Sequence, residues 1–179
     1  MIVCSMELTT VLIISFLIIS SVGTLLHFTH NWIKKGFLLH LFSALNESTW
    51  EHMKLLLLPT LLASVFQIFV FKGRYGNMNS AILVLLLVEL LAMPLIFEPL
   101  RVVFKKVHFG ITIGIFFVSI ALGLLAEYYI LINNIIVFNE VVAGILIYIV
   151  VILFGIFTFF PPKFFLFKDP VTGRYGDIS

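Results

Sequence analysis

Long apolar runs separated by short polar stretches are the main pattern along this chain. Five runs are long enough for a helix to cross a bilayer, which takes about 20 mainly apolar residues, and they cover residues 8–26, 55–71, 81–97, 109–132 and 141–160. None alternates apolar and polar positions as a membrane β-strand does. A sixth run, residues 36–45, is too short to cross. The pattern predicts an all-α polytopic helical membrane protein with five transmembrane helices plus a short re-entrant or interfacial half-helix.

Composition supports a lipid environment and narrows the possible chemistry. Of the 179 residues, 61% are hydrophobic and 11% are charged, whereas soluble domains are about 45–50% apolar. We therefore expect one integral membrane domain, residues 1–179, ending in a tail over 161–179. The single cysteine, Cys4, excludes an intrachain disulfide. The net charge is only +2 and the basic residues are scattered along the chain, so nucleic acid is not an expected partner.

The lysines and arginines predict the orientation of the chain. Placing residues 27–54, the connection 98–108 and the tail on the cytoplasmic side puts nine basic residues inside and two, Lys72 and Arg74, outside. The N-terminus is then outside and the C-terminus cytoplasmic. Three polar stretches far apart in sequence would meet at one membrane boundary.

The most polar of these stretches is NESTWEH, residues 46–52. Ser48 and Glu51 have the spacing of a capping box, in which Ser48 accepts from the Glu51 amide and Glu51 reaches back to the Ser48 amide. The second long helix would then begin here. Trp50 is expected at headgroup depth, where its amphipathic ring is favoured.

The same region offers a candidate polar or metal site at the cytoplasmic face. His27 and His30 are three residues apart and share one helix face; His40, Glu47, His52 and Glu98 can converge on them. Imidazole and carboxylate are common ligands of divalent metals. The candidate metal ligands are His27, His30 and His52; the candidate catalytic residues are Glu47, Glu51 and His52; and the candidate ligand-binding residues here are Asn46, Trp50 and Glu98. Alternatively, the histidines only bind headgroups and loop carbonyls at the boundary.

A second polar set lies inside the predicted spans. Glu89 falls near the middle of the third span, and Gln67 and Glu127 lie towards the outer ends of theirs. A carboxylate at the bilayer centre costs at least about 2–3 kcal/mol unless it is protonated or paired, so Glu89 is a candidate ligand-binding residue. A purely structural, protonated Glu89 bonded to a neighbouring helix is the alternative.

The tail contains a predicted turn around Asp169 and Pro170, with Gly173 suited to positive φ. In a functional interpretation, Asp169 and Arg174 bind ligand and close the inner cavity as a lid. In the structural interpretation, the segment is only a turn.

Two stretches of the sequence resemble motifs of a known group of proteins. NESTWEHMK, residues 46–54, and PPKFFLFKDPVTGRYG, residues 161–176, resemble motifs of small bacterial membrane proteins grouped as a domain of unknown function. The resemblance implies a polytopic protein of the bacterial inner membrane and no activity. It marks as signature positions Asn46, Glu47, Trp50, Glu51, His52, Asp169, Pro170, Gly173, Tyr175 and Gly176.

Three functions remain open from the sequence. The first is a transport or substrate-capture module that uses Glu89, Gln67 and Glu127. The second is an intramembrane enzyme, with or without a divalent metal, that uses the histidines and glutamates of the cytoplasmic face. The third is a noncatalytic scaffold of a membrane complex. Membrane lipids are the expected partners, together with a small-molecule ligand or other membrane subunits.

Overall fold

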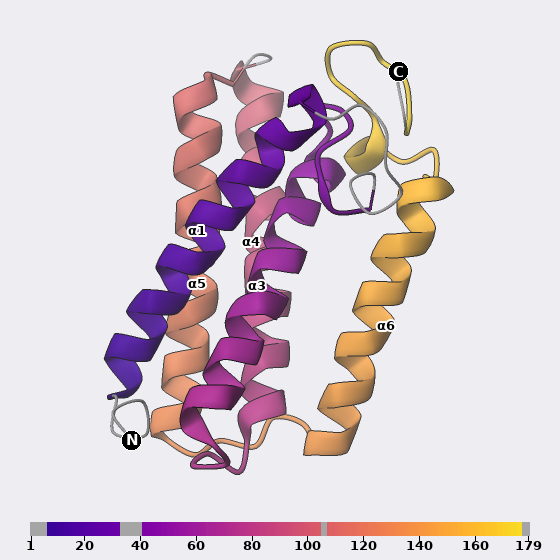
Figure 1. Cartoon of the computed structure of the whole chain (residues 1–179). Helices are drawn as coiled ribbons and strands as arrows, with labels where there is room; N and C mark the ends of the chain where they lie inside the picture. Colours follow the sequence, from indigo (N-terminus) through magenta and orange to yellow (C-terminus); the bar gives the residue numbers. More distant parts are fainter. Residues whose placement is uncertain (1–6, 33–40, 105–106, 177–179) are drawn as a thin grey trace.

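Five long helices make up most of the structure, a computed structural model (Figure 1). It describes residues 7–32, 41–104 and 107–176, with the side chains of 30–32 excepted. The helices are α1 (Leu8–Trp32), α3 (Thr49–Phe71), α4 (Met78–Phe104), α5 (Phe109–Ile132) and α6 (Glu140–Phe159), and a short 3₁₀ helix, η2 (Phe165–Phe167), lies in the tail. All five are long and apolar enough to cross a membrane. The predicted all-helical class with five candidate spans is confirmed, and no strand is present in the described part of the chain.

The predicted half-helix over residues 36–45 falls largely outside the described residues. Leu41 and Phe42 are helical, and the chain then runs through an irregular loop to Ser48. The half-helix therefore stays a prediction.

Local signals explain where several helices begin and end. Ser48 caps α3, His108 caps α5 and Asn139 caps α6, each through a side chain that accepts from a backbone amide in the first turn. α3 ends at Phe71 and is followed by Lys72, which adopts a left-handed conformation, and by Gly73 with φ +80°. Pro59 lies inside α3 and Pro94 and Pro99 lie inside α4, and both helices continue through them.

Close contacts between helices hold the bundle together. α4 packs on α5 and α1 on α3, while α1 also contacts α5 and α3 contacts α4. Two glycines allow these approaches: a Cβ at Gly23 would lie 2.8 Å from the Leu55 carbonyl oxygen, and one at Gly123 would lie 2.9 Å from that of Leu85. Small residues permit such packing where lipid supplies no hydrophobic drive between helices. α6 packs mainly on α4 and stands at one side of the bundle (Figure 1).

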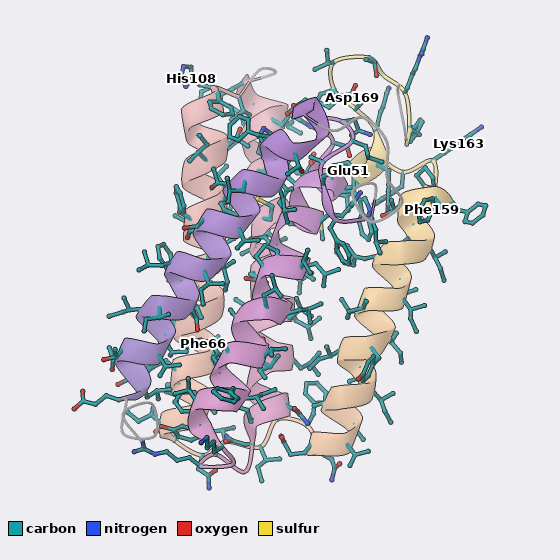
Figure 2. The ribbon with its side chains drawn as sticks, viewed as in Figure 1. Glu51, Phe66, His108, Phe159, Lys163 and Asp169 are labelled. Carbon is teal, nitrogen blue, oxygen red and sulfur yellow. The ribbon has the colours of Figure 1, made fainter. Side chains whose placement is uncertain are left out.

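The two ends of the bundle differ in composition. Figure 1 places the α3–α4 turn and the α5–α6 loop at the same end as the N-terminus. The other end carries the loop before α3, the α4–α5 connection and the tail (Figure 1); we call it the tail end. Figure 2 shows Glu51, His108 and Asp169 there. The fold thus brings the three predicted polar stretches to one end.

Candidate functional site

The start of α3 confirms half of the predicted capping box and corrects the other half. Ser48 Oγ accepts from the Glu51 amide at 3.4 Å. Glu51 does not reach back to Ser48: its Oε2 accepts from the Leu45 amide at 2.9 Å and from Lys54 Nζ at 2.8 Å. Asn46 takes the place of Glu51, because its Oδ1 accepts from the Ser48 amide at 2.8 Å in a short local turn.

Glu51 and Lys54 form a buried ion pair. Their side chains are 4% and 1% exposed. The prediction that Lys54 is a basic residue of the loop before the second long helix is wrong, because Lys54 lies in the second turn of α3 and its side chain is buried. Glu51 Oε2 thus holds the loop to α3, and a catalytic role of Glu51 stays a prediction.

Trp50 joins α3 to α6 and the tail. Its ring stacks on Phe154 of α6, with centroids 4.2 Å apart, and on Phe167 of η2, 4.5 Å apart. The residue is 8% exposed, because neighbouring aromatic rings cover the indole. Its position at headgroup depth stays a prediction. Its Nε1 has no hydrogen-bond partner among the described residues.

Further contacts lock the tail end together. Asn46 Nδ2 donates to the Gly176 carbonyl at 2.8 Å. Thr49 Oγ1 donates to Glu98, which also pairs with Arg101 at 2.8 Å. The predicted meeting of the three polar stretches is confirmed, while the membrane side on which they lie stays a prediction.

Asp169 organises the turn of the tail. It is 2% exposed, and its carboxylate accepts from the amides of Val171 and Thr172 and from the Thr172 hydroxyl. Its own amide donates to the Arg174 carbonyl at 2.9 Å, and Arg174 is exposed. These contacts bear out the turn. Binding of a ligand by Asp169 and Arg174 stays a prediction.

His27 and His52 lie together at the tail end of α1 and α3. Their ring centroids are 5.6 Å apart. His52 Nδ1 is 2.9 Å from the Ser48 carbonyl, and its Nε2 is 3.6 Å from Glu47 Oε2. Both rings line a cavity of about 110 Å³ between α1, α3 and α5, whose other walls are mainly apolar. None of the described tail residues lines it.

Part of the predicted metal site lies outside the described residues. The side chain of His30 and the whole of His40 lie outside the described residues. Among the side chains that are described, no three His, Cys, Asp or Glu residues are placed to hold a metal ion together. The divalent metal, and catalysis by Glu47, Glu51 and His52, stay predictions.

A buried polar cluster lies inside the bundle, formed by Ser15 of α1, Thr60 and Gln67 of α3, Glu89 of α4 and Glu127 of α5. All five residues have no exposed surface. Thr60 Oγ1 donates to Glu89 Oε1 at 2.5 Å. Gln67 Nε2 donates to Ser15 Oγ at 3.0 Å and to Glu127 Oε2 at 3.1 Å. The three intramembrane residues singled out in the sequence, Gln67, Glu89 and Glu127, therefore belong to one region that spans four helices.

The buried polar cluster has more acceptors than donors. Both protons of the Gln67 amide are used, the Thr60 proton goes to Glu89, and the Ser15 hydroxyl donates to the Val11 carbonyl at 2.9 Å. Three oxygens have no partner among the described residues: Gln67 Oε1, Glu89 Oε2 and Glu127 Oε1. A buried acceptor without a donor costs about 1–3 kcal/mol. The cluster therefore favours the uptake of protons or of another cation.

Sequence reasoning missed Ser15 and Thr60. Thr60, Ser64 and Gln67 are spaced four and three residues apart, so they lie on one face of α3. This polar stripe in an apolar span was the available signal for Thr60. Ser15 is one of three serines in α1, and nothing local distinguishes it from a serine that bonds only to its own helix.

Comparison with known proteins adds a family but no activity. Residues 3–177 match DUF6512, described as a family of unknown function, and the chain belongs to this family. No curated protein and no solved structure matches the chain. The predicted resemblance to a family of unknown function is thus confirmed at that level, while the two motifs and a bacterial origin stay predictions.

Proposed function

We propose that this DUF6512 member is a multi-pass membrane transport module in which Glu89 and Glu127 take up and release protons. The observation that carries the proposal is the donor deficit of the buried polar cluster, with three unpartnered oxygens on Gln67, Glu89 and Glu127. A proton on each carboxyl supplies two donors, and Gln67 Oε1 is an acceptor available to them. Ionisable groups inside a membrane protein typically mark ion pathways and proton relays.

The position of the cluster supports a role in transport. Its residues come from α1, α3, α4 and α5, so a change in protonation acts on four helices at once. Gly123, one helical turn before Glu127 on α5, lies next to Glu89 of α4, because a Cβ at Gly123 would be 3.3 Å from Glu89 Cβ. Loss of a proton would leave a buried charge at a tightly packed helix seam, which favours a different packing.

The other predicted functions have weaker support. Asn46, Trp50, Glu51, Glu98 and Asp169 each make contacts that hold the tail end together. An enzyme at this face would have to act through Glu47 and His52, and a scaffold has no feature of its own among the described contacts. Transport is therefore the function we carry forward.

We further propose that the protein lies in the inner membrane of a bacterium with the N-terminus outside and the tail in the cytoplasm. The support is the basic bias of the tail end, where Lys163, Lys168 and Arg174 are exposed. Membrane lipids are the proposed partners of the exposed apolar helix faces. Small-molecule substrates or further membrane subunits are also proposed as partners.

Proton binding can be tested by labelling with dicyclohexylcarbodiimide, an apolar reagent that modifies protonated carboxyls in a membrane interior. In the full chain in lipid vesicles, we expect mass spectrometry to find the adduct on Glu89 or Glu127. Glu89→Gln and Glu127→Gln should each remove their own adduct, and Glu7→Gln, at the exposed start of α1, should change nothing. Sodium that protects against labelling would show that the cluster also binds a metal cation, in competition with protons.

Transport needs a second measurement. Proteoliposomes containing a pH-sensitive dye are given an inward-negative potential, and we expect acidification that is lost in Glu89→Gln and Glu127→Gln and retained in Glu7→Gln. Wild-type protein that behaves like empty liposomes would contradict proton transport by the module itself. Acidification that survives both variants would place the proton route elsewhere.

A further inference from the structure

The cavity between α1, α3 and α5 has apolar walls and a polar end. Its walls include Phe109, Ile113 and Phe117, all exposed on the outer surface of the bundle. His27, His52 and Thr24 supply its polar lining together with Thr112. Since α1, α3 and α5 are candidate spans, a ligand can enter from the lipid with an apolar chain along the rings and a polar head at the histidines.

The polar end offers acceptors. His52 Nδ1 faces the Ser48 carbonyl at 2.9 Å, and a carbonyl only accepts, so this nitrogen carries the proton. In the neutral ring, Nε2 is then an acceptor. Thr24 Oγ1 gives its proton to the Ser20 carbonyl at 2.7 Å and is left with acceptor lone pairs. A ligand head that donates hydrogen bonds therefore matches His52 and Thr24.

Glu47 adds a negative charge beside this end. Its Oε2 lies 3.6 Å from His52 Nε2, too far for a direct hydrogen bond. A donor that lies within hydrogen-bond distance of both Glu47 Oε2 and His52 Nε2 would satisfy these two acceptors. The Glu47 side chain is 57% exposed, so it can move towards a bound cation at little cost to the fold.

We propose that this cavity binds an amphiphilic primary amine, with the ammonium between His52, Thr24 and Glu47 and the alkyl chain along Phe109 and Phe117. A cavity of about 110 Å³ exceeds what a bare metal ion fills, and no three described His, Cys, Asp or Glu side chains gather around one. This site is separate from the buried polar cluster, and the proposal does not depend on proton transport.

Binding of three ligands with the same chain length tests the proposal: dodecylamine, dodecanol and dodecanoic acid. The full chain is placed in nanodiscs of zwitterionic lipid, and specific binding is the excess over empty nanodiscs. We expect dodecylamine to bind most tightly. Glu47→Gln should weaken dodecylamine by about fivefold, as for a half-exposed ion pair, and should not weaken dodecanoic acid. Glu7→Gln, far from the cavity, should leave all three unchanged.

A second pair of variants locates the site. Ile113→Trp fills the mouth of the cavity and should abolish specific amine binding, whereas Ile145→Trp on the exposed face of α6 should not. Dodecanoic acid binding as tightly as dodecylamine would overturn the amine class. Amine binding that is unaffected by Ile113→Trp would overturn the location, and binding that is insensitive to Glu47→Gln would overturn the role of the carboxylate.

Discussion

Removing Lys54 should destabilise the protein, because it leaves Glu51 charged and buried. In Lys54→Met the apolar stem is kept and the 2.8 Å contact with Glu51 is lost. Breaking a buried pair by removing one partner costs about 3–5 kcal/mol. Glu51 keeps its hydrogen bond from the Leu45 amide, so we expect the lower end of this range, about 3 kcal/mol. That is a large share of a typical total of about 5–15 kcal/mol.

The double variant Glu51→Gln, Lys54→Met separates the ion pair from simple packing. It removes both charges and keeps an acceptor for the Leu45 amide, so we expect it to lie within about 1–2 kcal/mol of wild type and above Lys54→Met in stability. The measurement is equilibrium unfolding in mixed lipid and detergent micelles, followed by near-UV circular dichroism. Lys163→Met, at an exposed lysine of the tail, is the control. A double variant less stable than Lys54→Met would refute the reasoning.

Three further predictions are tested by the same unfolding assay, with protease digestion added for one of them. Gly123→Ala should destabilise the protein by about 1–3 kcal/mol, because its Cβ would lie 2.8 Å from Leu85 Cδ1. Gly114 has open space around it, so Gly114→Ala should be tolerated. Equal effects of the two substitutions would contradict the packing argument. Trp50→Ala should cost about 3–5 kcal/mol and expose the tail to protease, while Trp50→Phe should keep part of the stacking on Phe154 and Phe167. An equally protected tail in Trp50→Ala would contradict the role of Trp50 in holding the tail. Thr60→Val should cost about 1–3 kcal/mol, because both oxygens of the buried Glu89 carboxyl are then without a donor. Thr60→Ser keeps the hydroxyl and should retain most of the wild-type stability. Identical stability of the two variants would argue against the hydrogen bond from Thr60 to Glu89.

Hydropathy predicted the helices well because the bilayer imposes a length on each of them. The bounds of α5 coincide with the predicted span, and those of α6 differ by one residue at each end. α3 begins six residues before the predicted apolar run, at the cap that the Ser48 to Glu51 spacing indicated. Length and local capping are both properties of contiguous sequence, so they are readable without the fold.

Partners that depend on the path of the chain were not predictable, and this is where the site interpretation changed. Glu51 accepts from the Leu45 amide, while Asn46 satisfies the Ser48 amide, and both contacts depend on the path of the loop. Trp50 is covered by Phe154 and Phe167, which arrive from distant sequence. A helix that is apolar on all sides carries little information about its rotation.

The buried polar cluster shows the same limit. The sequence identified Gln67, Glu89 and Glu127 as costly residues inside spans. It did not reveal that Gln67 bonds to Glu127, or that Ser15 and Thr60 complete the set. Those pairings follow from how the helices pack.

Infrared spectroscopy of the full chain in lipid, with and without ¹³C-glutamate, tests most directly whether the buried polar cluster holds protons. At neutral pH we expect a carbonyl absorption of protonated carboxylic acid that shifts with the label, decreases in Glu89→Gln and in Glu127→Gln, and is unchanged in Glu7→Gln. A spectrum without that absorption, in which all glutamates are ionised, would contradict the proton-binding site.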